Sequence, residues 1–419
     1  MRSVIPIGPF HPLQDEPENF VLTVEGETVV DIDANIGYIH KGIELLAQKK
    51  TYDQTVFLVE RICGICSITH TICFCNAVED LLQVDIPERA KYLRTILGEI
   101  ERIHSHLLWA GLAGHFIGYN TVFMWVWKYR EPILDMMEYL TGNRQSCGML
   151  KVGGTRRDLD DSKFPELLKT LDEMEPKIRM LADAVQDDPV LKARLGGVGT
   201  LTKKDAIDYC VVGPTARASG VDIDVRRDEP YAAYPYLDWD VVVLPQGDVY
   251  AKFLLRVLEV LESIKILRQA VKQIPKGDHL LDIKEIPPGE GIGRYEAPRG
   301  EDIHYIRSNG TNYPERLKVR APSYINIPSF YASCIGQQVA DVTITLAAVD
   351  PCYSCAERMM SAKSVSCAER MMSAKSVSGN VRLDQASLIE KSRQRTYQVA
   401  RQIGKEPDLP ELRKILKSL

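Results

Sequence analysis

Four of the ten cysteines in this 419-residue chain form two Cys-x-x-Cys pairs, one near each end. Cys63 and Cys66 form the first pair, and Cys352 and Cys355 form the second. A two-residue spacer lets both sulfurs of a pair face one centre, and soft thiolates select zinc, iron–sulfur or nickel–iron chemistry over hard cations. The pattern therefore predicts one metal site closed by four thiolates.

Spacing alone leaves two interpretations of this site open. A structural zinc site is the commonest all-thiolate arrangement, and the spacing favours it. The two pairs lie far apart in the sequence, however, whereas the pairs of a zinc knuckle usually follow each other closely. We expect a site assembled from both ends of a large chain to lie in the core, and core burial suits a catalytic metal.

Composition narrows the class of protein. With 45% hydrophobic residues the chain can bury a large core, and 57 acidic against 52 basic residues argue against a nucleic-acid surface or a polybasic membrane anchor. The cysteines cluster rather than spread, which favours metal binding over disulfides. No run approaches about 18 consecutive apolar residues and no signal peptide opens the sequence, so we expect a soluble chain.

The elements that must position the cysteines are mostly helices. Apolar residues at helical spacing predict long helices from about residue 86 and over residues 121–140, 164–185 and 250–274. Two β-rich runs, 20–24 and 28–33, predict a hairpin, and residues 286–291 predict a loop before a second set of short strands. The expected fold class is α+β and predominantly α-helical, a long helix bundle with a small N-terminal β-sheet.

One segment is duplicated. Residues 354–365 recur without change as residues 366–377, with no third copy. The repeat matches no period of a known repeat fold, which excludes a solenoid. An identical neighbouring copy is better explained by a recent duplication or an error in the sequence than by a functional device.

Several motifs resemble one known family. Residues 60–66 and 350–355 resemble the N- and C-terminal signatures of the large subunits of nickel–iron (NiFe) hydrogenases. The motif at residues 8–12 resembles the membrane-associated, energy-converting (Ech-like) branch of this family, which is related to the quinone-site subunit of respiratory complex I. Five further motifs match: Gly8-Pro9-Phe10-His11-Pro12, His40-Lys41-Gly42-Ile43-Glu44, Glu101-Arg102-Ile103-His104-Ser105-His106, Gly213-Pro214-Thr215-Ala216-Arg217 and Glu296-Ala297-Pro298-Arg299-Gly300.

The resemblance implies a nickel–iron centre with a role for each cysteine. Cys63 and Cys352 would bind nickel alone, and Cys66 and Cys355 would bridge nickel to an iron that carries CO and cyanide. Such a centre would catalyse the reversible oxidation of H2 to two protons and two electrons. Thiolates make nickel electron-rich, and the diatomic ligands keep the iron low-spin with a position open for hydrogen.

The resemblance also implies residues around the metals. Arg299 matches an arginine whose guanidinium hangs over the open position, with Asp350 as the acid beside it. Pro322 and Ser323 resemble residues that contact a cyanide. Glu16 matches, by its distance from Cys63, the glutamate that carries protons away from a terminal cysteine, although local sequence alone favours a solvated acid.

Other candidates are less specific. Glu44 resembles a ligand of a second, hard ion, magnesium or iron, with a helix-surface carboxylate as the alternative. Arg358 stands where many members have a histidine ligand of that ion, which leaves the second site in doubt. His70 is expected to orient a cysteine by a hydrogen bond rather than to bind a metal. The remaining cysteines are expected in the core or as a spare thiol: Cys73, Cys75, Cys147, Cys210 and Cys334, and the unpaired Cys367.

Domains, partners and location follow from the same resemblance. We expect residues 1–358 to form one large-subunit domain and residues 359–419 to be a maturation peptide, cut after Arg358, or a retained helical tail. Electrons would pass to a small subunit with a 4Fe-4S cluster and to a ferredoxin-type carrier. Antiporter-like membrane subunits would move ions, and nickel-insertion and maturation proteins would load the metals. The chain would be cytoplasmic and peripheral on the inner face of the cell membrane.

Two rival functions remain. A sulfur- or quinone-reducing subunit of the same ancestry would keep the fold without hydrogen chemistry, and lost cysteines would mark it. All four are present. A non-catalytic scaffold stabilised by zinc would contain zinc alone.

Overall fold

The computed structural model describes residues 2–11, 14 and 16–359, all within one unit that spans Met1–Met360. The second copy of the repeat, Cys367 and nearly all of the expected C-terminal extension lie outside the described residues. The expected division into domains and the cut after Arg358 therefore stay predictions.

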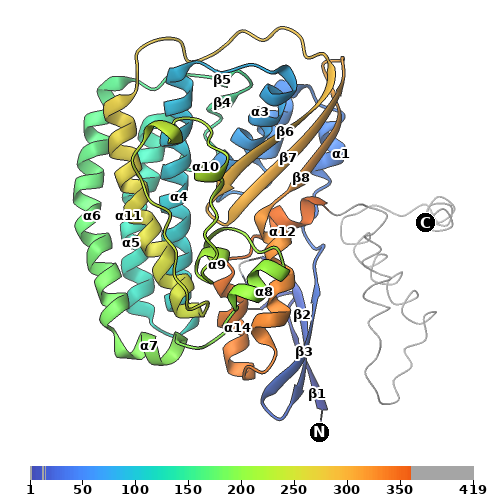
Figure 1. The fold of residues 1–419 in the computed structure, drawn as a ribbon, viewed down its shortest axis with the longest axis vertical. Coiled ribbons are helices and arrows are strands. Elements are labelled where there is room, and N and C mark those ends of the chain that lie inside the picture. The colour runs from blue at the N-terminus through green and yellow to red at the C-terminus, as the bar shows by residue number, and fades with distance from the viewer. Residues whose placement is uncertain (1, 12–13, 15, 360–419) are drawn as a thin grey trace, which may run out of the picture. The chain divides into compact units, whose positions relative to one another are not determined.

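Four long helices stand side by side as a bundle (Figure 1). Helix α4 packs against α5 and α11, and α11 packs against α6. Their apolar residues recur at helical spacing, which is why the sequence predicted each of them to within a few residues. The helices are α4 (Glu88–Phe116), α5 (Asn120–Thr141), α6 (Phe164–Asp187) and α11 (Val249–Gln273).

A three-stranded antiparallel sheet lies beside the bundle and supports α3 (Figure 1). Its strands, in the order β6-β7-β8, are β6 (Pro288–Ala297), β7 (Gly300–Asn309) and β8 (Pro314–Arg320). Helix α3 (Ser67–Leu82) packs directly on β6. A Cβ atom at Gly293 would lie 2.1 Å from the carbonyl oxygen of Cys73, so glycine is needed for this close approach. The predicted loop at 286–291 is too long, because β6 already begins at Pro288.

A second antiparallel sheet lies at the N-terminus, in the order β1-β2-β3. Strands β2 (Asn19–Glu25) and β3 (Thr28–Asn35) form the predicted hairpin, and β1 (Arg2–Ile7) pairs with β2. The apolar face of this sheet shares a core with α13 (Phe330–Cys334), α14 (Val339–Ala348) and α15 (Tyr353–Ala356). This packing brings the start of the chain next to its second cysteine pair.

Shorter elements connect these layers. They are α1 (Ile43–Ala47), α2 (Tyr52–Glu60), β4 (Leu150–Lys151), β5 (Gly154–Thr155), η1 (Asp161–Lys163), α7 (Pro189–Leu195), α8 (Lys203–Asp208), α9 (Gly213–Arg217), α10 (Val225–Asp228), η2 (Tyr234–Tyr236), α12 (Pro322–Asn326), η3 (Ile327–Ser329) and η4 (Glu357–Met359).

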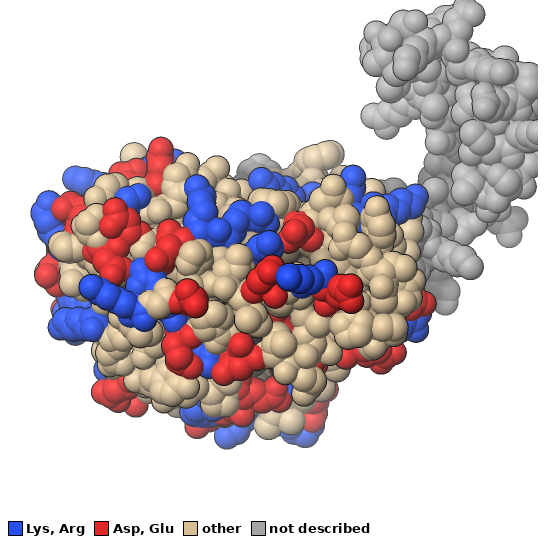
Figure 2. Space-filling view, turned by 90° about the horizontal axis from the view of Figure 1, so that it is seen from above, with Lys and Arg blue, Asp and Glu red and all other residues tan. Residues whose placement is uncertain are grey.

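The surface agrees with the near balance of charge in the sequence. On the face shown in Figure 2, the basic and acidic side chains of the described residues are interspersed, without an extended patch of one sign. Among residues 2–11, 14 and 16–359, no helix has both the length and the apolar character that crossing a bilayer requires.

Candidate metal centre

The four cysteine sulfurs meet in the interior. Cys352 Sγ lies 3.0 Å from Cys355 Sγ and 3.4 Å from Cys63 Sγ, and Cys66 Sγ lies 3.3 Å from Cys355 Sγ. All four sulfurs lie within 4.8 Å of one another, and each cysteine is at most 4% exposed. Both ends of the chain therefore supply one compact set of soft donors, of the kind that binds nickel, iron or zinc.

Glu101 holds the first pair in place. Cys66 is the N-cap residue of α3 but makes no capping bond with its side chain. The Glu101 carboxylate, from α4, accepts hydrogen bonds from the backbone N–H groups of Ile68 and Thr69, at 2.6 and 2.9 Å, and from Thr69 Oγ at 2.5 Å. A carboxylate suits a helix N-terminus, yet burial raises the pKa of Glu101 to about 7. Glu101 thus substitutes for the missing cap beside Cys66.

The second pair begins in a strained turn. Asp350 has a φ of 57°, in the left-handed region that non-glycine residues seldom adopt. Ser323 Oγ accepts a hydrogen bond from the Cys352 N–H at 2.9 Å. Ser323 and its neighbour Pro322 are buried beside this pair.

Glu16 reaches the same turn from the N-terminal segment. Its carboxylate accepts hydrogen bonds from the N–H groups of Tyr353 and Ser354, at 2.5 and 2.9 Å, and from the Ser354 hydroxyl. Burial raises the pKa of Glu16. The sequence alone would leave this acid in solvent, but the structure binds it to the two residues that separate Cys352 from Cys355 in the sequence.

Arg299 is bound by Asp350 through both backbone and side chain. Arg299 Nε donates to the Asp350 carbonyl oxygen at 2.9 Å, Nη2 lies 2.8 Å from Asp350 Oδ1, and Nη1 donates to Ser105 Oγ at 3.2 Å. Burial opposes the charged form, but Asp350 and the cysteines hold the pKa of Arg299 above its usual value. A permanent cation with a fixed orientation therefore faces the thiols.

A histidine–aspartate–histidine cluster adjoins Cys355. His70 Nε2 lies 3.3 Å from Cys355 Sγ, and His70 Nδ1 lies 2.9 Å from Asp302 Oδ2. His304 Nε2 lies 3.3 Å from the same Asp302 oxygen, and all three residues are buried. Because one ring nitrogen of His70 faces a carboxylate, its orientation toward the sulfur is fixed.

A small cavity lies on the side of Cys66 and Cys355. It provides room next to the two sulfurs that the resemblance assigns as bridging. The cavity is lined by Cys66, Thr69, His70, Ala297, Pro298, Arg299, Pro322, Ser323 and Cys355.

The thiols differ in acidity. Hydrogen bonds from Cys352, Cys355 and Cys66 lower the pKa of Cys63, whereas burial raises the pKa of Cys355. The hydrogen bond to Cys352 likewise raises the pKa of Cys66. A metal ion that binds here must displace the protons that remain on these thiols.

Glu44 is not presented to a second metal ion. Its Oε2 lies 2.8 Å from Lys318 Nζ, and its Oε1 accepts from the Val319 N–H at 3.0 Å. Arg358, also buried, donates to the Ile39 carbonyl oxygen. Both Glu44 oxygens are engaged by donors within the protein, so the donor set does not fit a hard cation there, and we derive no step from one.

Sequence reasoning missed several groups of the site. Glu101 stood in a matched motif without a role, and Asp302 and His304 alternate along β7 with no local sign that they face His70. One expectation was wrong: Cys210 is exposed, whereas Cys73, Cys75, Cys147 and Cys334 are buried. Cys210 follows α8 with a φ of 54° in the turn that ends this helix, a position that places it at the surface.

The chain is similar to known proteins over most of its length. The family model described as "Respiratory-chain NADH dehydrogenase, 49 Kd subunit" matches residues 117–286 and 279–358, and the model described as "Nickel-dependent hydrogenase" matches residues 41–110. The membrane-bound hydrogenase subunit alpha of Pyrococcus furiosus is 39% identical over 86% of this chain and 88% of its own length. The chain belongs to the family of complex I 49 kDa subunits and NiFe hydrogenase large subunits.

The names of these relatives describe different activities. The carbon monoxide-induced hydrogenase of Rhodospirillum rubrum is 38% identical over 84% of this chain and 99% of its own length. A chain in the structure of the membrane-bound sulfane sulfur reductase, an archaeal respiratory membrane complex, superposes with a TM-score of 0.81 at 29% identity, over 85% of this chain and 98% of that chain. Family membership thus establishes an oxidoreductase-related subunit and leaves its reaction to the site.

Proposed function

We propose that this chain is the catalytic subunit of an energy-converting NiFe hydrogenase that interconverts H2 with two protons and two electrons. The observation that carries the proposal is the meeting of four buried cysteine sulfurs within 4.8 Å of one another, with the Arg299 guanidinium held close to them. Complete retention of the cysteines argues for a metal reaction on this member of the family.

The chain's own donors fit the proposed metals. Cys63 and Cys352 would bind nickel alone, and Cys66 and Cys355 would also bind an iron carrying CO and cyanide. The cavity beside Cys66 and Cys355 could take the diatomic ligands, with the Ser323 hydroxyl at its wall. When bound, the two metals supply the electron-accepting centre at which H2 is split. Because Glu44 is engaged by Lys318, the proposal includes no second metal site.

The protein's residues would act around that centre. Arg299 would polarise hydrogen with a fixed positive charge, since its clamp by Asp350 prevents it from turning away. Glu16 would accept and release the protons next to the second cysteine pair, because its raised pKa brings it closer to neutral pH. His70 would hold Cys355 in position.

Electrons must leave to another protein. In the described part of the chain, the only other group suited to a metal is His70 with Asp302 and His304, which contains no cysteine. We propose that a small subunit with a 4Fe-4S cluster accepts the electrons and passes them to a ferredoxin-type carrier. Antiporter-like membrane subunits would hold the complex at the inner face of the membrane and move ions, and nickel-insertion and maturation proteins would load the metals.

Metal analysis and infrared spectroscopy test the proposal together. The purified complex should contain nickel and iron in near-equal amounts, show the stretching bands of CO and cyanide, and reduce a dye with H2. The C352S variant should lose all three properties, whereas the exposed C210S variant should keep them. Zinc alone, without the infrared bands, would refute the proposal in favour of a zinc-stabilised scaffold.

Reduction of sulfur compounds is the second candidate. The superposition on the sulfane sulfur reductase chain, at a TM-score of 0.81, favours it. A preparation that reduces a polysulfide with a reduced carrier, but neither consumes nor evolves H2, would support sulfur reduction over the hydrogenase proposal.

A further inference from the structure

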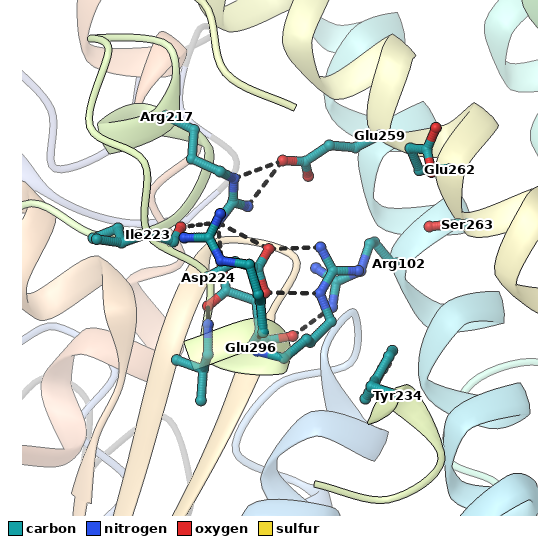
Figure 3. A network of polar contacts seen from close by, with 12 residues as sticks. Arg102, Arg217, Ile223, Asp224, Tyr234, Glu259, Glu262, Ser263 and Glu296 are labelled. Carbon is teal, nitrogen blue, oxygen red and sulfur yellow. Dashed lines mark hydrogen bonds and ion pairs between the residues drawn. The ribbon is translucent and has the colours of Figure 1, made fainter. Parts of the chain in front are cut away.

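A cluster of charged side chains from α4, α9, α10, α11, β6 and the N-cap of α10 lies buried in the protein (Figure 3). Arg217 links Glu259, which lies beside it, to Asp224 and Glu296, which lie below it in the view (Figure 3). Every member is at most 4% exposed. The members are the carboxyls of Glu99, Asp224, Glu259 and Glu296 and the guanidiniums of Arg102, Arg217 and Arg226.

The cluster has one more acid than it has bases. Four carboxyls face three guanidiniums, and an uncompensated charge in a buried site is costly. His106 does not supply the missing cation: its Nε2 lies 2.8 Å from Glu259, but its Nδ1 has no hydrogen-bond partner among the described residues, and burial lowers its pKa to about 4. Arg256 adds a positive charge on the side of Glu259, but it lies over the Trp109 ring and donates to the Lys252 carbonyl oxygen rather than to Glu296.

Three of the four carboxylates are well compensated. Glu99 accepts from Tyr234 and Ser263, each at 2.6 Å, and lies near two arginines. Both Nε and Nη2 of Arg217 lie within 2.9 Å of Glu259, whose other oxygen faces His106.

Asp224 is also well compensated. Arg226 approaches both of its oxygens, at 2.9 and 2.7 Å, and the Arg226 N–H donates to it at 3.0 Å. Despite burial, Arg226 and Arg217 hold the pKa of Asp224 below its usual value.

Glu296 has the weakest set of partners. One oxygen lies 2.7 Å from Arg217 Nη1, and the other accepts only a long bond of 3.3 Å from the Val225 N–H. The same Arg217 nitrogen lies 3.3 Å from Asp224 and donates to the Ile223 carbonyl oxygen at 3.0 Å, so two carboxyls share it. Burial and the Asp224 charge raise the pKa of Glu296 to about 7.

We propose that this cluster is a proton-binding site that takes up and releases one proton on the Glu296 carboxyl near neutral pH. The charged and titratable groups around that carboxyl are Arg217 on α9, Asp224 and Arg226 at α10, Arg102 and Glu99 on α4, Glu259 and His106 on α11 and α4, and Tyr231 and Tyr234 in and before η2. With the proton in place, three carboxylates face three guanidiniums within the cluster.

The site is tied to the strand that leads to Arg299. Glu296 and Ala297 end β6, and Arg102 donates to their carbonyl oxygens at 2.5 and 3.1 Å. The proton on Glu296 therefore lies three residues from the cation that faces the thiols, on a segment whose backbone the cluster itself holds. It is separate from Glu16 and does not depend on which metal the cysteines bind.

Infrared difference spectroscopy of the full chain tests the proposal. The wild-type spectrum minus that of E296Q should contain the carbonyl band of a protonated carboxylic acid, which disappears as the pH is raised through neutrality. Glutamine keeps an acceptor for Arg217, so the variant should fold. The control E79Q, at a buried carboxylate that Arg94 binds with two nitrogens at 2.6 and 2.8 Å, should not remove this band.

The D224N variant gives an independent check if E296Q does not fold. Removing the neighbouring charge lets Glu296 ionise at neutral pH, so the same band should be lost although Glu296 is intact. No titrating band in the E296Q difference spectrum, or a band that persists in D224N, would overturn the proposal.

Discussion

Replacing Arg299 with methionine tests how much the ion pair between Arg299 and Asp350 stabilises the folded protein. The Asp350 carbonyl oxygen accepts a hydrogen bond from Arg299 at 2.9 Å, and its carboxylate forms an ion pair with Arg299 at 2.8 Å. Both residues are 6% exposed. R299M therefore breaks a buried ion pair, which typically costs ~3–5 kcal/mol of unfolding free energy. D350N alone should also destabilise, because it leaves the guanidinium without its counter-charge.

The double variant R299M/D350N distinguishes the energy of the ion pair from the loss of packing that each single variant causes. With both charges removed, the loss in unfolding free energy should be smaller than the sum of the two single losses by ~1.5–3 kcal/mol. Urea denaturation of the full chain measures all three values. The control R307M breaks a pair with Glu315 in which the two side chains are 46% and 42% exposed, and it should cost at most ~1 kcal/mol. Additive losses for R299M and D350N would refute the reasoning.

Three further predictions concern the surroundings of the thiols. G213A should destabilise the chain and lower activity, because a Cβ at this position would lie 2.4 Å from Gly300 Cα and 2.5 Å from the Arg299 carbonyl oxygen. The control G26A has a similar φ and no atom within 4 Å of the added Cβ, so it should cost only ~1–2 kcal/mol in thermal or urea unfolding. E101A should lower unfolding free energy by ~1–3 kcal/mol more than E101Q, since glutamine still offers an oxygen to the amides of Ile68 and Thr69, and equal losses would contradict the capping role. Because burial raises the pKa of Glu101 in the folded protein, this residue stabilises the wild type fully at pH below about 4.5, and the contribution is lost as the pH rises through about 7. The E101Q variant should lack this pH-dependent contribution. Urea titrations across this pH range measure it, and a pH profile equal to that of the wild type would contradict the prediction.

The helices that carry the site were predictable, because their apolar residues follow one period over many turns. Residues at helical spacing in α4 and α11 outweigh the charged residues between them, so the pattern survived even though Glu99, Arg102 and Glu259 face inward. The short strand β1 was missed, since it is largely exposed and contains Pro6, and neither property marks a strand.

The cysteine pairs were predictable from local motifs, whereas the residues that orient them were not. Cys63 and Cys66 stand out by spacing alone, but Glu101 contacts their helix from another element and Glu16 reaches the second pair from the N-terminal segment. The buried charge cluster shows the same limit: charged residues are normally exposed, so nothing in the sequence indicates that Asp224, Arg226 and Glu296 meet in the interior. Such partners are set by how distant elements pack.

Nickel K-edge X-ray absorption of the purified complex tests most directly whether both ends of the chain bind one metal. Four sulfur ligands at nickel are expected in the wild-type complex. Nickel surrounded by nitrogen and oxygen donors, with no more than two sulfurs, would mean that the two cysteine pairs do not share a metal.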